Sequence, residues 1–108
     1  PLSAKALIVE DEDALREFFT YDFENAGFQV STARDGVEAS NLISTESFDV
    51  VVSDLRLPKK SGLALLEEVR SLRERELPIF VGITGAEPIN LEKAYDLGMH
   101  ELVEKPFD

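Results

Sequence analysis

Short strand-like segments and longer amphipathic segments alternate along the chain. The strand-like segments are rich in β-branched and other apolar residues and are bounded by charged or turn-forming residues, as strands commonly are. They lie at 6–9, 28–33, 48–53, 78–84 and 101–104. Most of them are near-continuous apolar runs, which is typical of strands that are covered on both faces of a sheet.

Four segments between these strands carry apolar residues at helical spacing. The first begins at Asp13, places a leucine and several phenylalanines on one face and stops at Gly27. The second follows a turn signal and spans 35–44. The third carries a stripe of leucines and a valine over 65–72, and the fourth spans 87–98, with a proline in its first turn and a glycine at its end.

This alternation predicts a doubly wound α/β domain, with a five-stranded parallel sheet between two layers of helices. We expect a single domain over 1–108, with its core at about 4–107. No helix follows the last strand, and four helices shared between two faces would leave apolar sheet surface in contact with water. We therefore expect a fifth helix in a longer parent protein, of which this chain is a fragment.

The composition narrows the range of functions. Eleven basic residues against 22 acidic ones leave a net charge of −11, which argues against nonspecific binding to nucleic acid or to anionic membranes. Cysteine is absent and His100 is the one histidine, so thiolate and histidine-cluster metal sites are excluded and His100 is expected to be structural. No apolar run reaches the length of a membrane span and no signal peptide opens the chain, so a cytoplasmic setting is the default expectation.

Polar residues gather where the predicted strands end. Glu10 and Asp11 follow the first strand in the stretch LIVEDED, Asp54 follows the third, Thr84 ends the fourth and Lys105 follows the fifth. The carboxyl ends of parallel strands share one edge of the sheet, so these acids converge if the first and third strands are neighbours. Such a cluster is unfavourable unless a cation occupies it, and ligands that are all oxygen suit Mg²⁺.

A metal beside a carboxylate, a hydroxyl and a lysine outlines a phosphoryl-transfer site, because that chemistry depends on neutralising charge around the phosphoryl oxygens. A carboxylate can itself be the nucleophile and form an aspartyl phosphate. The adjacent Glu12 and Asp13 are interpreted as complements to the positive end of the first helix. Lys59 and Lys60 are expected to be solvated loop charges.

Four stretches taken together resemble the receiver domains of two-component response regulators: LIVEDED, VVVSDLRLPKKSGLALL, VGITGAE and LVEKPF. The resemblance runs from about Ala6 to Phe107 and keeps the family's order of motifs. It implies a flavodoxin-like, three-layer fold with strand order 2-1-3-4-5 and five helices. It also implies a bacterial signalling domain that takes a phosphoryl group from a histidine kinase or phosphotransfer protein, and not an enzyme with a separate substrate.

The resemblance assigns metal and phosphate roles residue by residue. Asp54 matches the phosphoacceptor, which is also a metal ligand, and Asp11 matches the direct Mg²⁺ ligand. Glu10 matches the acid that holds the metal through water, and Mn²⁺ is expected to substitute for Mg²⁺. The backbone carbonyl of Arg56 matches a further ligand. We add the hypothesis that the Arg56 side chain reaches back to Glu10 or Asp11 and competes with the metal in the resting state.

Further roles follow from the same resemblance. Thr84 and Lys105 match the hydroxyl and the ammonium that meet the phosphoryl group. Pro106 matches a proline whose preceding peptide bond is typically cis. Arg56 and Ala86 occupy positions that tune the lifetime of the phosphorylated state.

The segment 87–104 is expected to shift on phosphorylation and to contact an output domain, a partner protein or a second copy of the chain in a homodimer. Family members often carry an aromatic residue where this chain has Leu102. The relay from the threonine to an aromatic residue therefore lacks its second member here, and backbone shifts are the alternative. No direct binding of this domain to nucleic acid or membrane is expected.

Three other functions stay open as alternatives. A receiver-like interaction module that is not phosphorylated is disfavoured because every required side chain is present. A phosphatase of the haloacid dehalogenase type needs a second acid two residues after its aspartate, where this chain has Arg56. A flavodoxin-like cofactor carrier needs a phosphate-binding loop after the first strand, where this chain places acids that repel phosphate.

Overall fold

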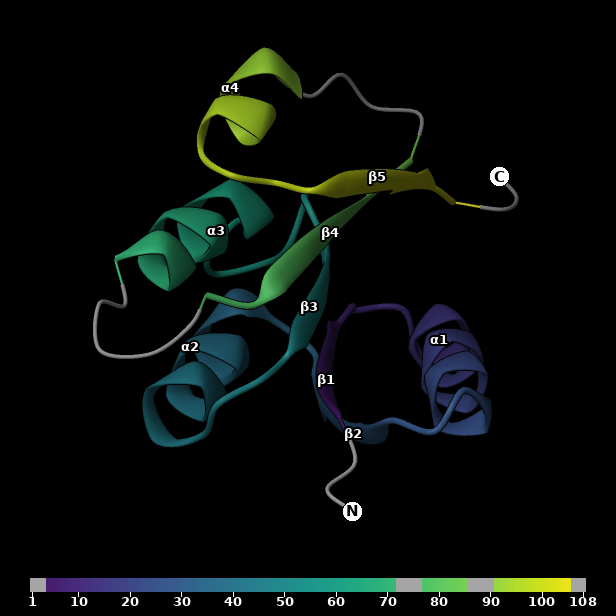
Figure 1. The fold of residues 1–108 in the computed structure, drawn as a ribbon. Helices are drawn as coiled ribbons and strands as arrows, with labels where there is room; N and C mark the ends of the chain where they lie inside the picture. The colour runs from purple at the N-terminus through teal and green to yellow at the C-terminus, as the bar shows by residue number, and fades with distance from the viewer. Residues whose placement is uncertain (1–3, 72–76, 86–90, 106–108) are drawn as a thin grey trace.

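The computed structural model describes residues 4–71, 77–85 and 91–105. Within these ranges five strands and four helices alternate along the chain (Figure 1). The strands are β1 (Lys5–Val9), β2 (Gln29–Ala33), β3 (Val50–Asp54), β4 (Ile79–Thr84) and β5 (Glu101–Glu104). The helices are α1 (Asp13–Asn25), α2 (Gly36–Thr45), α3 (Gly62–Arg70) and α4 (Leu91–Asp96).

All five strands pair in parallel, in the order β2-β1-β3-β4-β5. The predicted doubly wound fold and strand order are therefore confirmed. The register sets Val9 of β1 opposite Ser53 of β3, and Asp54 of β3 opposite Ile83 of β4. The carboxyl ends of these three central strands consequently reach the same edge of the sheet, at the point where the strand order reverses.

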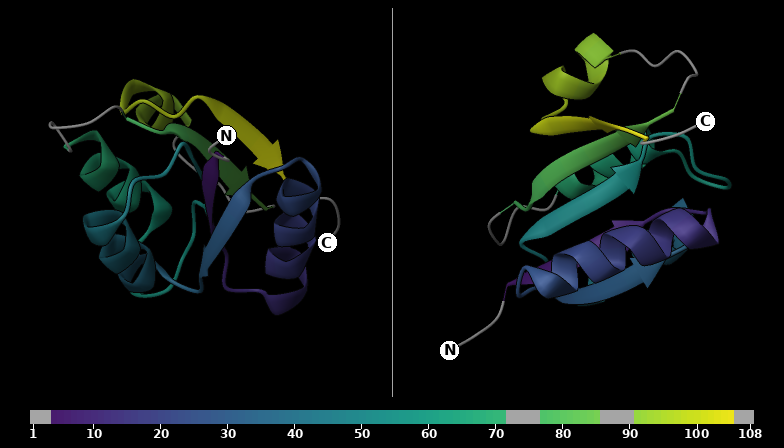
Figure 2. Two further views of the ribbon diagram at one scale, coloured as in Figure 1. Left: turned by 60° about the horizontal axis from the view of Figure 1, so that its bottom comes forward. Right: turned by 90° about the vertical axis from the view of Figure 1, so that its right-hand side faces the viewer.

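The helices cover the two faces of the sheet unequally, as Figure 1 and Figure 2 show. On one face, α2, α3 and α4 enclose the larger core cluster, which includes Val51 and Phe80 of the sheet. On the other face, Leu15 and Phe19 of α1 pack in a smaller cluster with Ile8 of β1. Alternation along each strand divides the apolar side chains between these two clusters.

The face that carries α1 keeps apolar surface in contact with water. Ile79 of β4 is 50% exposed and Val103 of β5 is 37% exposed. Val81, which lies on the same face, is half-buried. A fifth helix packed on this face would cover these three residues. That helix remains a prediction.

Local interactions account for small differences between predicted and observed boundaries. The helix expected over 35–44 begins one residue later, because Asp35 is its N-cap and accepts a hydrogen bond from the Glu38 N–H at 2.9 Å. Asp54, expected after the third strand, is the last residue of β3 and pairs with β4.

The predicted helices differ from the observed ones in other respects. In α1, Leu15 and Phe19 are buried, whereas Phe18 is 54% exposed and lies outside the core. The helices expected over 65–72 and 87–98 fall partly outside the described residues. None of the helices within the described ranges combines the length and apolarity that crossing a membrane requires.

His100 has the structural role that was expected of it. Its Nδ1 accepts a hydrogen bond from the Phe80 N–H at 3.0 Å, and its own N–H donates to the Phe80 carbonyl at 2.8 Å. These two bonds extend the hydrogen bonding between β4 and β5 to His100, the residue just before β5.

Ser61 is the N-cap of α3, since its Oγ accepts a hydrogen bond from the Ala64 N–H at 3.1 Å. Ser61→Ala is expected to lower the free energy of unfolding by about 1 kcal/mol, measured by urea denaturation. Ser44→Ala is the control, because the Ser44 hydroxyl donates to the Asn41 carbonyl within α2 and caps no helix start. An equal loss in both variants would contradict the capping role.

Candidate functional site

Three carboxylates meet at the edge of the sheet formed by the ends of β1 and β3. Glu10 and Asp11 directly follow β1, and Asp54 ends β3. One oxygen from each of these side chains lies within 4.8 Å of the others. Pairing of β1 with β3 is the cause, because it joins residues that are distant in sequence.

The Asp54 carboxylate is buried and held from two sides. It is 3% exposed, its Oδ1 accepts the Arg56 N–H at 2.7 Å, and its Oδ2 lies 2.9 Å from Lys105 Nζ. Ser53 Oγ donates to the Asp54 backbone carbonyl at 2.9 Å. Position and orientation of the carboxylate are thus determined by both the backbone and a charged side chain.

Glu10 is the most deeply buried acid of the site. Its side chain is 0% exposed, and its Oε2 accepts the Glu12 N–H at 3.0 Å. Among the residues that the structure describes, Glu10 Oε1 has no hydrogen-bond partner. Burial above all, with the nearby Asp54 and Asp11 carboxylates, raises the pKa of Glu10 to about 8.

Lys105 supplies positive charge to this cluster. Its Nζ lies 2.9 Å from Asp54, 3.8 Å from Glu10 and 4.0 Å from Glu12. Burial acts to lower the pKa of the Lys105 ammonium, but the hydrogen bond and attraction to Asp54, aided by the two glutamates, outweigh it and raise that pKa. The Lys105 N–H also donates to the Thr84 carbonyl at 2.7 Å, which ties the lysine to the end of β4.

The remaining predicted site residues are Thr84, Arg56, Ala86 and Pro106. Thr84 is half-buried, and its Oγ1 is 3.4 Å from the Gly85 carbonyl. Arg56 is exposed, and its backbone N–H donates to Asp54 Oδ1. Metal ligation by the Arg56 carbonyl, and competition of its side chain with the metal for Glu10 or Asp11, remain predictions. Ala86 and Pro106 lie outside the described residues.

Leu102 lies in β5 opposite Gly82 of β4 and packs against the larger core cluster. The position that often holds an aromatic residue in the family is therefore filled by an aliphatic side chain within the fold.

One expectation about the site's surroundings was wrong. Lys60 is not a solvated charge, because its Nζ contacts Glu68 of α3 at 2.5 Å and Ser40 of α2 at 2.8 Å. Lys59 is 68% exposed, yet its Nζ lies 3.3 Å from Asp35. Ser40 lies 20 residues before Lys60, and Glu68 lies 8 residues after it in the next helix, so the spacing along the sequence does not indicate these contacts.

The donor set fits Mg²⁺. Asp11 and Asp54 offer oxygen atoms beside Glu10, whose buried and unpartnered Oε1 is a polar atom that a hydrated cation would satisfy. Hard oxygen ligands, few in number and leaving room for water, are those that Mg²⁺ prefers. A cation would also offset the repulsion among three carboxylates that Lys105 alone balances only in part.

Comparisons with known proteins identify relatives of the chain. A sequence model of the family described as the response regulator receiver domain matches residues 6–108. The alkaline phosphatase synthesis transcriptional regulatory protein PhoP of Bacillus subtilis is 33% identical over 108 residues, which cover 98% of this chain and 44% of PhoP. The chain thus spans less than half the length of such curated relatives.

Solved structures agree with this match. A CheY-like response regulator receiver domain from Methylobacillus flagellatus is 35% identical, with a TM-score of 0.84, over 99% of this chain and 90% of that one. The receiver domain of Ssk1 from Saccharomyces cerevisiae, solved with the histidine phosphotransfer protein Ypd1, has a TM-score of 0.82 at 21% identity, over 98% of this chain and 81% of that one. The likeness to Ssk1 concerns the fold alone.

Proposed function

Because the chain belongs to the response regulator receiver family, we propose that it accepts a phosphoryl group on Asp54 with the help of Mg²⁺ and then changes conformation. The observation that carries this proposal is the buried Asp54 carboxylate, held 2.9 Å from Lys105 and beside the carboxylates of Glu10 and Asp11. A nucleophilic carboxylate, an ammonium and a set of oxygen ligands are the groups that phosphoryl transfer requires.

The donor in this proposal is a phosphohistidine on a histidine kinase or phosphotransfer protein. A carboxylate oxygen of Asp54 attacks phosphorus, the new O–P bond forms as the N–P bond breaks, and the donor imidazole keeps the electron pair of that bond. Lys105 then pairs with the oxygens of the transferred group. Asp11, Asp54 and the Arg56 carbonyl would hold Mg²⁺, with Glu10 acting through water, and the bound metal would neutralise charge on the phosphoryl oxygens.

In this proposal, the charge that phosphorylation adds to Asp54 triggers the change of conformation. Phosphorylation adds about −1.5 to −2 charge at the sheet edge, and we expect the Thr84 hydroxyl and Lys105 ammonium to turn toward it. Because the Lys105 N–H is bonded to the Thr84 carbonyl at 2.7 Å, a movement of one residue is passed to the other. The segment 87–104 then shifts against an output domain, a partner or a second copy of the chain.

The wider context is also a proposal. PhoP is named a transcriptional regulatory protein, and by this likeness we propose that the chain is the receiver part of a longer cytoplasmic regulator. Ala86 and Arg56 are proposed to tune the lifetime of the phosphorylated state. The cis bond before Pro106 likewise remains a prediction.

The proposal is tested by adding a small phosphodonor, with and without Mg²⁺, and measuring the intact mass. We expect the mass of one phosphoryl group to appear in the presence of Mg²⁺ and to be lost in Asp54→Asn. Asp22→Asn, which removes an exposed acid on α1, is the control and should react like the unaltered chain. The absence of a Mg²⁺-dependent gain, or a gain that survives Asp54→Asn, would refute the proposal.

The second candidate function is a receiver-like interaction module that is not phosphorylated, which Leu102 favours because the usual aromatic residue is absent. If the chain is such a module, the phosphodonor experiment should show no added phosphoryl mass, even though the chain binds Mg²⁺. A haloacid dehalogenase-type phosphatase is the weakest candidate, since Arg56 stands where that chemistry needs an acid.

A further inference from the structure

The loop 55–61, between β3 and α3, contains a strained turn close to the proposed phosphoacceptor. Lys59 has a φ of 68°, and it is the one non-glycine residue of the described ranges with positive φ. The Lys60 N–H donates to the Pro58 carbonyl at 2.7 Å, which closes a γ-turn around Lys59. A γ-turn with positive φ is rare and strained in an L-residue, so surrounding contacts must stabilise it.

The loop connects this turn directly to the Asp54 carboxylate. At its start, the Arg56 N–H donates to Asp54 Oδ1 at 2.7 Å. At its end, the Gly62 N–H donates to the Leu55 carbonyl at 3.3 Å and closes the loop on itself. A change of conformation in the middle of so short a loop would therefore shift the backbone of Arg56, whose carbonyl is a proposed metal ligand.

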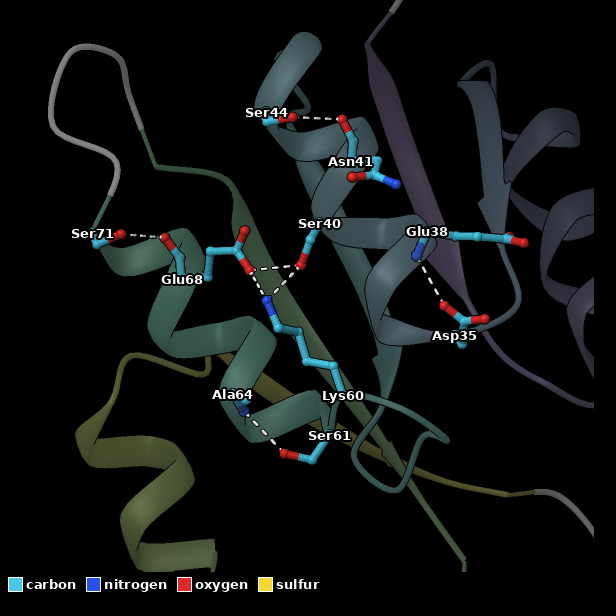
Figure 3. Close-up of polar contacts among 10 residues, drawn as sticks. All are labelled: Asp35, Glu38, Ser40, Asn41, Ser44, Lys60, Ser61, Ala64, Glu68 and Ser71. Atoms are coloured by element: carbon cyan, nitrogen blue, oxygen red, sulfur yellow. Dashed lines mark hydrogen bonds and ion pairs between the residues drawn. The ribbon is translucent and has the colours of Figure 1, made fainter.

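Lys60 fastens the turn to two helices, as Figure 3 shows. Its Nζ donates to Ser40 Oγ of α2 at 2.8 Å and to Glu68 Oε1 of α3 at 2.5 Å. Ser40 Oγ in turn donates to the same Glu68 oxygen at 2.6 Å. Burial acts to raise the pKa of the Glu68 carboxyl, but the hydrogen bonds from Lys60 and Ser40 outweigh it and lower that pKa.

The backbone of Lys60 also lies against α2. A Cβ added at Gly36 would lie 2.5 Å from Lys60 Cβ and 2.8 Å from its carbonyl carbon, so this close approach requires glycine. Beside it, Lys59 Nζ is 3.3 Å from Asp35, the N-cap of α2. That pair is the weaker attachment, because Lys59 is 68% exposed and solvent screens the interaction.

We propose that Lys60 is a positioning residue for the metal site: through Ser40 and Glu68 it holds the γ-turn in the conformation that presents Arg56 and Asp54 to Mg²⁺. The inference rests on the proposed function, since it assumes that Mg²⁺ binds at Asp54. Within the described residues, Lys60 forms no hydrogen bond or ion pair with Asp11, Asp54 or Arg56, so its effect is on the strength of metal binding and not on the chemical step.

The test compares Lys60→Met, Glu68→Met, which removes the acceptor oxygens, and the double variant by calorimetric titration with Mg²⁺ alone. Each single variant is expected to weaken Mg²⁺ binding by about 3- to 10-fold, the effect of losing one typical intramolecular hydrogen bond. The double variant should lose no more than a single one, because both substitutions break the same interaction. With a small phosphodonor, the Mg²⁺ concentration for half-maximal rate should rise while the rate at saturating Mg²⁺ stays unchanged.

A matched control exists at the opposite end of the sheet. Lys5 and Glu46 form an ion pair at 2.8 Å with both side chains 35% exposed, close to the 34% and 31% of Lys60 and Glu68. Lys5→Met should therefore leave Mg²⁺ affinity unchanged.

Several results would overturn the inference. These are unchanged Mg²⁺ affinity in Lys60→Met, additive losses in the double variant, or an equal loss in Lys5→Met, which would indicate a general loss of stability. In each of these cases the unaltered chain would still bind Mg²⁺ and react at Asp54, so the proposed function would stand. If the unaltered chain does not bind Mg²⁺, both the inference and the proposed function fail.

Discussion

Gly62→Ala is expected to lower the free energy of unfolding by about 1–3 kcal/mol, as overpacking against an unyielding structure does. A Cβ at this position would lie 2.7 Å from Leu55 Cα and 3.1 Å from the Asp54 carbonyl carbon, and it would also overlap the Asp54 carbonyl oxygen. These are backbone atoms at the end of β3, which pairs with β1 on one side and β4 on the other. The strand cannot move aside, so α3 must start elsewhere.

Urea denaturation measures this loss, with Gly85→Ala as the control. A Cβ at Gly85 meets Lys105 Cδ at 3.6 Å, an ordinary contact, and its φ is not in the left-handed region. Gly85→Ala should therefore unfold at the same or a slightly higher urea concentration. If Gly62→Ala unfolds at the same concentration as the unaltered chain, the close approach of α3 to Asp54 is wrong.

Glu10→Gln is expected to stabilise the metal-free protein at about pH 8 by on the order of 2 kcal/mol, because it removes a buried carboxylate that is costly to ionise. Glu10 is 0% exposed, and burial is the main reason why its pKa rises to about 8 from an ordinary value of 4.5. Its Oε1 has no hydrogen-bond partner within the part of the chain that the structure describes.

The sign follows from proton linkage. Between pH 4.5 and about 8, the folded protein keeps a proton on Glu10 that the unfolded chain has released. The free energy of unfolding therefore falls as pH rises through this window, and the loss is complete above about pH 8. With glutamine at position 10 this contribution to the slope disappears.

Unfolding in urea with a chelator, at about pH 5.5 and about pH 8, measures the effect. Glu17→Gln, an exposed acid on α1, is the control and should keep the pH dependence of the unaltered chain. Saturating Mg²⁺ at the higher pH should restore stability to the unaltered chain, because the metal favours the ionised carboxylate. An unaltered pH slope in Glu10→Gln would contradict the assignment.

The order of elements was readable from the sequence because it depends on local patterns. Apolar runs such as 48–53 and the helical stripe that begins after Asp13 each report the period of one element. Parallel strands carry their ligand residues at one edge, so the meeting of Asp11 with Asp54 followed once β1 and β3 were neighbours. The strand order itself came from the family resemblance and not from the local pattern.

Phe18 illustrates a limit of periodicity. It shares the helical stripe of Phe19, yet it is 54% exposed, whereas Phe19 is buried. Helical spacing identifies a face that is wider than the contact with the sheet, so the edge of that face is decided by where α1 lies on the sheet. The same spacing could not tell a core residue from a surface one.

By itself, the sequence determined the types of element, their order and the chemical groups at the strand ends, because these are properties of neighbouring residues. Only the tertiary structure decided that Glu10 is the acid with the raised pKa and that Lys60 is bound between Ser40 and Glu68. Burial and ion pairing depend on residues brought together from distant parts of the chain, and the free energy of a charge depends on that surrounding. A run of four acids therefore contains one buried carboxylate, Glu10, followed by three exposed ones.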